Sequence, residues 1–299
     1  MNIVILGAGA IGSLFGSLLS KNNNVVMVGR KDHVDTINKK GLEIQGKTKI
    51  KYKIQAFEQL KDISFKPDLL IISVKSYDTE KAIKQAKSII NQNTIVMSIQ
   101  NGLDNIEKIS KFVNPENILI CITTHGAFFS KPGVIIHTGI GKTTIGACGG
   151  KNIQKIQKCV KIFNNSDIKT SINTNIKQDM WIKAIVNSSI NPLTTFFQCK
   201  NSYLLENPIL KNLVEQICLE STKIARKNGF SIETSDTLKK TKEVIYDTAD
   251  NYSSMLQSLQ KGKKTEIDSI NGKLVEIGKK LDCNTFLNEI LIHSIKMIS

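Results

Sequence analysis

Residues 3–17 constrain this chain more than any other stretch, and they read IVILGAGAIGSLFGS. Four apolar residues run into a GxGxxG pattern, and apolar residues of helical period follow, which predicts a strand, a tight turn and a helix. In such a unit Gly7 permits the sharp turn, Gly9 lets a pyrophosphate approach the backbone, and Gly12 lets the helix pack against the strand. The N–H groups at the start of the helix would then hold the anion. The stretch therefore predicts a dinucleotide-binding turn.

The alternative for the same stretch is a signal peptide or a membrane helix, because residues 3–19 carry no charge and Gly12 and Gly16 form a GxxxG pair. No basic residue precedes the run, and its apolar length falls short of the roughly 20 residues that a span needs. Glycines inside a helix would also cost about 1 kcal/mol each. These points favour dinucleotide binding. Since no later segment reaches spanning length, we predict a cytoplasmic protein without membrane contact.

A chain of 299 residues with 40% hydrophobic and 22% charged residues has the length of one large or two ordinary globular domains. Its net charge of +15 raises the question of nucleic-acid binding. The lysines are spread along the whole chain, no block of five like charges occurs, and aromatic residues make up only 6%. Because no basic and aromatic run could stack bases, we predict no nucleic-acid partner, although a basic surface attracts anionic substrates and cofactors.

The cysteines and histidines show no spacing that is typical of a metal site. The six cysteines form no CxxC pair and fit reduced packing residues, and the four histidines show no HExxH spacing. No metal is therefore predicted.

Strand and helix patterns alternate through the first half, which predicts an α/β fold with a parallel sheet covered on both faces. A second strand at residues 25–28 is followed by Gly29 and Arg30. NAD-binding domains usually place Asp or Glu here for the ribose 2′-hydroxyl, whereas a cation accommodates the 2′-phosphate of NADP. Arg30 therefore favours NADP, and the alternative is one more surface base in a lysine-rich chain.

Three further strands end in residues that suit a ligand crevice. Lys75 follows the apolar run 68–74, Asn101 follows the next strand, and residues 123–127 (TTHGA) follow the one after. In an open parallel sheet the crevice lies outside the carboxyl ends of the strands. We therefore expect these residues to line it together with the glycine turn.

Two local patterns complete the first half of the chain. Residues 42–55 alternate like a hairpin that turns near Gly46, and a helix is expected over 151–164. Beyond residue 172 the pattern is helical almost throughout. We therefore expect a domain boundary there, with residues 1–172 as the cofactor-binding domain and residues 173–299 as a helical substrate and catalytic domain.

In the helical half, residues 181–201 read WIKAIVNSSINPLTTFFQCKN. Lys183, Asn187 and Asn191 are four residues apart, which puts all three on one face of a helix. Pro192 is expected to end or kink that helix. A lysine and two amides on a largely apolar helix indicate a site, but an exposed polar stripe fits the spacing equally well.

Residues 251–268 form a last polar stretch, and its spacing alone does not indicate a functional site. Asn251 and Ser254 could face the same crevice, although Ser254 also fits an ordinary helix start. Glu266 fits an ordinary surface carboxylate.

The chain as a whole resembles the 2-dehydropantoate 2-reductases, or ketopantoate reductases. The matching pieces follow the order of that family over essentially the full length: GAGAIG at 7–12, VKS at 74–76, QNG at 100–102, TTHGA at 123–127, WIKAIVNSSINPLT at 181–194, SSMLQ at 253–257 and TEID at 265–268. The lysine-asparagine-asparagine-proline helix and the SSMLQ and TEID pair are specific to the family, whereas GAGAIG is shared by many nucleotide binders. The resemblance implies a Rossmann-type doubly wound sheet followed by an all-helical C-terminal domain.

The resemblance also implies an activity, the NADPH-dependent reduction of 2-dehydropantoate to (R)-pantoate on the route to pantothenate and coenzyme A. By position, Lys183 and Glu266 are the implied catalytic residues. Lys183 resembles the catalytic lysine, a general acid for the carbonyl oxygen, and Glu266 resembles a carboxylate beside the cofactor. The implied cofactor contacts are Gly7, Ala8, Gly9, Ala10, Ile11, Gly12, Arg30, Lys75, Asn101, Ala127 and Glu266. The implied substrate contacts are Asn101, Lys183, Asn187, Asn191, Asn201, Asn251 and Ser254.

One departure from the family pattern leaves alternatives open. Many members carry Asp directly after SSMLQ, and this chain has Ser258. This departure keeps open an NADPH-dependent reductase of another branched 2-oxo acid. The net charge of +15 motivates a different alternative, a non-catalytic NADPH-binding sensor or a nucleic-acid-associated protein. The partner in both enzyme interpretations is a small 2-oxo acid. The sequence allows a homodimer but does not indicate one.

Overall fold

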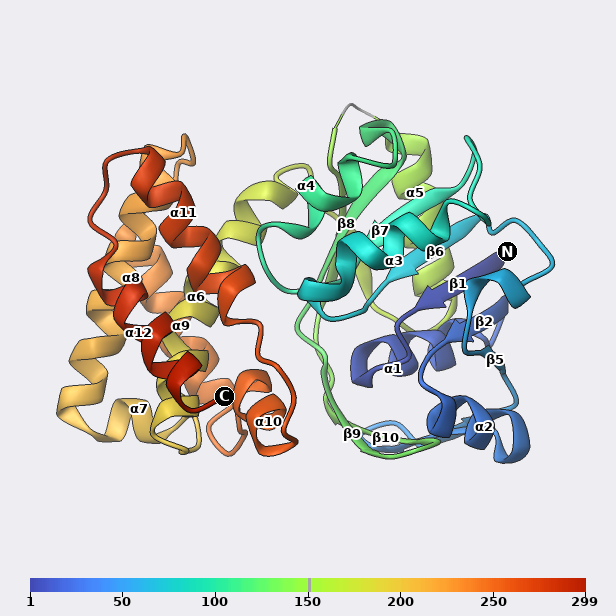
Figure 1. Cartoon of the computed structure of the whole chain (residues 1–299), viewed down its shortest axis with the longest axis horizontal. Helices are drawn as coiled ribbons and strands as arrows, with labels where there is room; N and C mark the ends of the chain where they lie inside the picture. The colour runs from blue at the N-terminus through green and yellow to red at the C-terminus, as the bar shows by residue number, and fades with distance from the viewer. Residues whose placement is uncertain (150–151) are drawn as a thin grey trace. The chain divides into compact units, whose positions relative to one another are not determined.

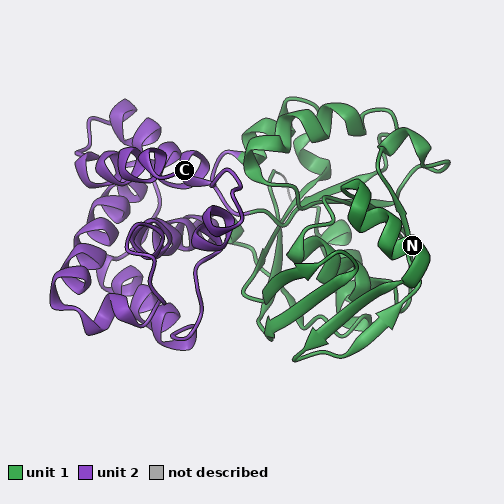
Figure 2. Ribbon diagram, turned by 60° about the horizontal axis from the view of Figure 1, so that its bottom comes forward, with its two compact units in different colours: residues 1–100, 105–176 green, residues 101–104, 177–299 purple. Residues whose placement is uncertain are grey.

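The computed structural model describes residues 1–149 and 152–299, and it divides into two compact units. The first unit comprises residues 1–100 and 105–176, and the second comprises residues 101–104 and 177–299 (Figure 2). The last strand of the first unit ends at Ile172, and the unit itself ends at residue 176.

An eight-stranded sheet forms the centre of the first unit, in the order β12-β11-β8-β7-β6-β1-β2-β5. Its strands are β1 (Asn2–Leu6), β2 (Asn24–Val28), β5 (Gln55–Phe57), β6 (Leu69–Ile72), β7 (Ile95–Ser98), β8 (Ile118–Thr123), β11 (Thr143–Ala147) and β12 (Thr170–Ile172). Neighbouring strands are parallel except β8 and β11, which are antiparallel. The strand order reverses at β1, which lies between β2 and β6, as in a doubly wound sheet. The predicted fold class is confirmed.

Helices connect the strands of this sheet (Figure 1). They are α1 (Ala10–Leu19), α2 (Lys31–Lys40), α3 (Thr79–Ala86), α4 (Asn105–Ser110) and α5 (Ile153–Asn165). The helix expected over 151–164 is α5, and residue 151 lies outside the described residues.

A second sheet in the same unit has four strands in the order β4-β3-β10-β9. They are β3 (Leu42–Gly46), β4 (Ile50–Tyr52), β9 (Gly126–Lys131) and β10 (Val134–Gly139). β3 and β4 pair antiparallel with Leu42 opposite Tyr52, which confirms the hairpin expected over 42–55. β10 runs parallel to β3, so two segments far apart in the sequence share this sheet.

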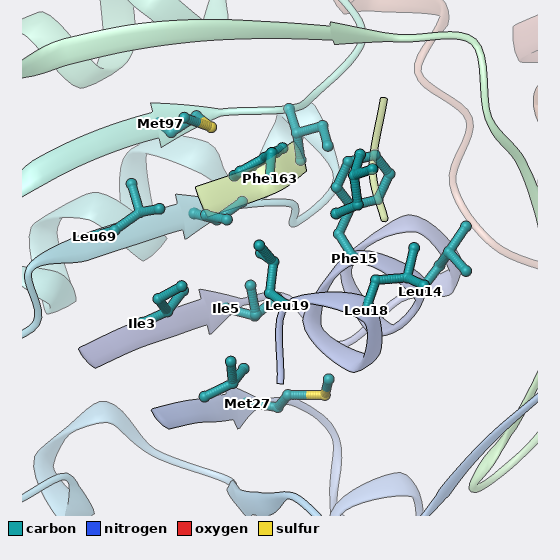
Figure 3. Packing of buried hydrophobic residues seen from close by; sticks show 14 of the residues in the cluster. Ile3, Ile5, Leu14, Phe15, Leu18, Leu19, Met27, Leu69, Met97 and Phe163 are labelled. Atoms are coloured by element: carbon teal, nitrogen blue, oxygen red, sulfur yellow. The ribbon is translucent and has the colours of Figure 1, made fainter. Parts of the chain in front are cut away.

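The core of the first unit explains why its strands have continuous apolar runs. Ile3 of β1 and Leu14 and Phe15 of α1 belong to one apolar cluster, and all three are fully buried (Figure 3). α1 lies close to the sheet because Gly16 has no side chain where the methyl group of Met27 approaches, and an added Cβ would collide with it. Gly16 therefore serves the packing of helix on strand.

The second unit is helical (Figure 2). Its elements are α6 (Ile176–Phe196), α7 (Tyr203–Glu206), α8 (Pro208–Lys227), α9 (Thr234–Asp247), α10 (Ser254–Gln260), a π-helical turn (Asp268–Gly272), α11 (Lys273–Lys280) and α12 (Phe286–Met297). α6 does not end at Pro192 but continues to Phe196. Trp181 and Val186, both on α6, belong to two apolar clusters that hold these helices together. No helix in the described ranges is long and apolar enough to cross a membrane.

Candidate functional site

The GxGxxG turn between β1 and α1 has the geometry that its glycines require. Gly7 has φ = +112°, and a Cβ there would lie 2.5 Å from the backbone N of Val74. A Cβ at Gly12 would collide with the Gly7 carbonyl and the Ser73 hydroxyl, so a larger residue would push α1 off the strand. No atom lies within 4 Å of the Cβ position at Gly9. The turn is a tight cradle with one open side, at Gly9.

The first turn of α1 offers backbone amides to an anion. Gly9 is the N-cap residue and has no side chain that could accept hydrogen bonds from these amides. The positive end of the helix dipole lies at the same place. A pyrophosphate is a group that fits this cradle.

Arg30 lies at the same edge of the sheet as the glycine turn. It is exposed and is the N-cap residue of α2, shortly after β2. The Val28 carbonyl at the end of β2 accepts hydrogen bonds from the N–H groups of Gly7 (3.0 Å) and Ala8 (2.9 Å). These bonds hold the start of α2 beside the turn, where an exposed guanidinium can bind a phosphate.

Gln100, directly after β7, joins the ends of two neighbouring strands. Its Nε2 atom donates to the Val74 carbonyl (2.8 Å) and to the Thr79 hydroxyl (2.7 Å). Gln100 thereby holds the end of β7 against the loop that carries the half-buried Lys75. Gln100 is part of the QNG piece of the sequence, which predicted no role for it, and the available signal was its place between a predicted strand and Asn101.

Asn101 belongs to the short segment 101–104, which groups with the second unit. The N–H of Leu103 donates to the Ser269 carbonyl in the π-helical turn (3.1 Å), and the Ser269 hydroxyl donates to a carboxylate of the same segment (3.2 Å). Leu103 also lies in the apolar cluster of Trp181. The second unit therefore holds the segment that begins with Asn101.

Lys183, Asn187 and Asn191 form what we call the polar face of α6. Lys183 and Asn187 are half-buried, and Asn191 has 6% of its surface exposed. The intervening Ile185 and Ile190 are in the core. Because polar side chains on a solvated helix face are usually exposed, this burial favours a site over the exposed stripe that the spacing also allowed.

Asn201 and Asn251 are hydrogen-bonded to each other through the backbone. The N–H of Asn201 donates to the Asn251 carbonyl (3.0 Å), and Asn201 Nδ2 donates to the Thr248 hydroxyl (2.8 Å). The Asn201 Oδ1 atom is buried and has no hydrogen-bond partner among the described residues. A buried amide oxygen without a donor costs free energy, so this atom is suited to accept from a ligand.

The helix-start role that the spacing suggested for Ser254 belongs to its neighbour Ser253. Ser253 has the extended backbone of a cap, and its Oγ accepts from the Leu256 N–H (3.2 Å) and from the Thr194 hydroxyl of α6 (2.8 Å). Ser254 is exposed at the first position of α10. Ser258 is buried and donates its hydroxyl to the Ser254 carbonyl (3.0 Å).

Ala10 and Ile11 are the first two residues of α1, and two further expected contacts, Glu266 and Ala127, lie in different units. Glu266 has 9% of its surface exposed and lies shortly before the π-helical turn, so it is not the surface carboxylate that its spacing also allowed. Ala127 is on β9 opposite His137 of β10. It therefore belongs to the second sheet.

Three histidines form buried contacts that no local pattern predicted. His33 Nε2 lies 3.1 Å from the Ser13 hydroxyl, and its Nδ1 accepts from the N–H of Gly133 (2.9 Å). His125 Nδ1 and His137 Nε2 are 3.0 Å apart. Burial lowers the pKa of His33 and of His125 to about 4, so both imidazoles are neutral at pH 7. Within the described ranges, no three His, Cys, Asp or Glu side chains are grouped so that they could hold a metal ion.

A doubly wound sheet with a glycine cradle at its switch point, followed by a helical unit with a shielded polar face, is the architecture of a two-domain dinucleotide-dependent oxidoreductase. Comparison with known proteins identifies the family within this class of oxidoreductases. Two family models match the chain, described as ketopantoate reductase PanE/ApbA over residues 3–150 and ketopantoate reductase PanE/ApbA C terminal over residues 175–299. The chain therefore belongs to the ketopantoate reductase family and is an oxidoreductase.

Individual relatives agree with this assignment. The chain is 42% identical to the 2-dehydropantoate 2-reductase of Pyrococcus abyssi, over 99% of this chain and 97% of that protein. It is 31% identical to the 2-dehydropantoate 2-reductase of Vibrio cholerae, over 100% and 98%. Among solved structures, D-mandelate dehydrogenase with NADH and anilino(oxo)acetate has a TM-score of 0.94 and 27% identity, over 100% of this chain and 98% of that one. A PanE/ApbA family ketopantoate reductase from Ralstonia eutropha has a TM-score of 0.92 and 24% identity, over 100% and 98%, which shows the fold alone.

Proposed function

We propose that this protein reduces 2-dehydropantoate to (R)-pantoate with NADPH, a step on the route to pantothenate and coenzyme A. One observation carries the proposal: the second unit by itself brings the segment of Asn101 against α6 and against the turn that follows Glu266. These elements carry the residues that the family resemblance implies for catalysis. The names of the relatives in Pyrococcus abyssi and Vibrio cholerae support the identity of the substrate.

A nicotinamide dinucleotide fits the first unit. The open side of the cradle at Gly9 and the amides of the first turn of α1 suit a pyrophosphate. The exposed Arg30 suits a 2′-phosphate, which supports NADPH over NADH. When bound, this cofactor supplies the hydride for the carbonyl carbon.

The residues of the second unit would manage the charge of the substrate. Reduction of a 2-oxo acid leaves negative charge on the carbonyl oxygen, and Lys183 as an ammonium stabilises this charge and donates the proton. Asn187 and Asn191 donate neutral hydrogen bonds to substrate oxygens without burial of another charge. The Asn201 Oδ1 atom, which is buried without a donor, accepts from the hydroxyl group of 2-dehydropantoate.

A second candidate is the reduction of another branched 2-oxo acid. Ser258 stands where many members of the family carry Asp, and D-mandelate dehydrogenase shares 27% identity with this chain. The buried Asn201 Oδ1 atom favours the hydroxylated substrate over this candidate. A non-catalytic NADPH-binding sensor would leave the shielded polar face of α6 without a role.

A steady-state assay separates these functions. Purified protein and NADPH are mixed with ketopantoate or with trimethylpyruvate, which differs from ketopantoate only by lacking the hydroxyl group. We expect loss of the absorbance of reduced nicotinamide with ketopantoate, and a kcat/KM roughly 10- to 100-fold lower with trimethylpyruvate, because one buried acceptor is then left without a donor. A preference for trimethylpyruvate or another 2-oxo acid would support the second candidate. No oxidation of NADPH with any 2-oxo acid would support the sensor.

A further inference from the structure

Pro192 removes a hydrogen bond at the polar face of α6. In a regular α-helix the carbonyl of Ser188 would accept from the N–H of residue 192, and proline has no N–H. Ser188 is fully buried, so water cannot replace the lost donor. A buried carbonyl without a partner would destabilise the helix between Asn187 and Asn191.

Asn271 supplies the missing donor from another element. Its Nδ2 atom donates to the Ser188 carbonyl (3.2 Å) and to Asn288 Oδ1 (2.9 Å). Asn288 in turn donates to Glu220 (2.8 Å) and to Ser221 (3.2 Å), which fixes its orientation. A carbonyl can only accept, so the nitrogen of Asn271 must face Ser188.

Asn271 lies in the π-helical turn Asp268–Gly272, shortly after Glu266. The same turn holds the segment of Asn101 through the hydrogen bond from Leu103 to the Ser269 carbonyl. π-helical turns are rare and occur frequently at functional sites. The hydrogen bond from Asn271 to α6 thus connects the helix of Lys183 with the turn that follows Glu266, and this turn also binds the segment of Asn101.

We propose that Asn271 is a positioning residue for the reduction: it supplies the hydrogen bond that Pro192 removes and so fixes the turn after Glu266 against α6 at Ser188, between Asn187 and Asn191 of the polar face. This inference rests on the proposed function, because that face is assigned to the 2-oxo acid. The Oδ1 atom of Asn271 is buried without a partner among the described residues. An amide at this position therefore serves as a donor.

A double-mutant cycle between Asn271 and Pro192 tests the proposal. Asn271→Ala should lower kcat/KM for ketopantoate on the order of 10²-fold, mainly through KM, because small displacements of a site have effects of this size. Pro192→Ala restores an N–H that can reach the Ser188 carbonyl, so Asn271→Ala in that background should leave KM nearly unchanged. Equal effects of Asn271→Ala in both backgrounds would overturn the proposal. If the single Asn271→Ala variant does not fold, the Pro192→Ala variant is compared with the double variant. A large rise in KM in the double variant would then overturn the proposal.

Thr222→Ala is the matched control. Thr222 is fully buried on α8, and its hydroxyl is hydrogen-bonded to the Cys218 carbonyl (2.7 Å) and to the Thr237 hydroxyl (2.8 Å), outside the network of Asn271. We expect a lower melting temperature for this variant with the KM of the native protein. A rise in KM as large as that of Asn271→Ala would show a general effect of lost buried hydrogen bonds in this unit and would overturn the positioning role.

Hydrogen–deuterium exchange supplies a readout that does not depend on turnover. Amides of α6 around Ser188 should exchange faster in Asn271→Ala and should return to the native rate when Pro192→Ala is added. Native exchange in the single variant would overturn the inference. If the native protein fails to reduce ketopantoate, the proposed function fails, whereas this exchange pattern still decides whether Asn271 replaces the lost donor.

Discussion

At the scale of single residues, burial separates Lys183 from the exposed lysines of this chain. Lys183 is half-buried on the polar face of α6. Lys31 is exposed and pairs with Asp35 (3.1 Å) and Glu58 (3.7 Å). A charge that is shielded from water interacts more strongly with a charge that develops nearby. The exposure of their side chains therefore distinguishes Lys183 from Lys31, although the two residues count alike in the composition.

Lys183→Ala should lower kcat for ketopantoate by several powers of ten, since the variant loses both the charge and the proton donor at the carbonyl oxygen. NADPH should still bind, because the cradle and Arg30 are in the first unit. Steady-state kinetics and a fluorescence titration of NADPH measure the two effects. Lys183→Arg is the control that retains the charge. Near-normal turnover of the alanine variant would contradict the assigned role.

Arg30→Ala should raise the KM for NADPH roughly 10- to 100-fold and leave the KM for NADH within about twofold, because a charged hydrogen bond contributes about 2 kcal/mol. The comparison of cofactors matters because D-mandelate dehydrogenase, a structural relative, was solved with NADH. The neighbouring Lys31, whose charge is already paired, is the matched control, and Lys31→Ala should change neither constant. Equal losses with both cofactors would contradict a role for Arg30 in binding the 2′-phosphate.

At the scale of elements, local sequence patterns predict those structures that depend on residues close together in the sequence. The glycine turn, the hairpin at 42–55 and the polar face of α6 follow from the periods of strands and helices. The pairing of β10 with β3 depends on contacts between distant segments, so no local pattern indicates it. Pro192 shows the same limit within the site, because the local rule predicts a helix end and a distant amide, Asn271, replaces the lost donor. Gln100 likewise acts through partners in another loop.

His33 joins α1, α2 and the turn between β9 and β10, and this joint should make the stability of the first unit depend on pH. Its pKa is lowered to about 4 from the usual 6.5, because burial disfavours the charged form of the ring. The unfolded chain therefore takes up the proton first as the pH falls. Stability is full above pH 6.5 and is lost progressively down to pH 4. The loss should be about 3 kcal/mol.

Urea unfolding of the native protein and of His33→Gln, measured at several pH values over this range, checks this prediction. The variant should be less stable at pH 7 and should lose less stability as the pH falls. His293→Gln is the control, since His293 is exposed on α12. An identical pH dependence in native protein and His33→Gln would mean that other groups cause the acid sensitivity.

At the scale of the whole molecule, the net charge of +15 is the property that distinguishes this chain from an average globular protein. The charge comes from lysines that are distributed along the sequence rather than gathered in one block. Such a surface attracts anions over a distance set by the ionic strength. Both proposed ligands, a 2-oxo acid and a phosphorylated dinucleotide, are anions. The charge therefore suits capture of the reactants and does not require a nucleic acid.

We expect kcat/KM for ketopantoate and for NADPH to fall several-fold as the ionic strength rises from about 0.01 to 0.15 M, because the screening length shortens from roughly 30 to 8 Å. The decrease should be smaller with NADH, which lacks the 2′-phosphate. Steady-state kinetics over a potassium chloride series at fixed pH measure both effects, and kcat should change little because it does not include capture. A duplex DNA fragment titrated over the same series should lose its binding before physiological salt, as non-specific phosphate contacts do. A kcat/KM that is independent of salt would show that the field does not assist capture, and DNA binding that survives physiological salt would show that the charge serves a nucleic acid instead.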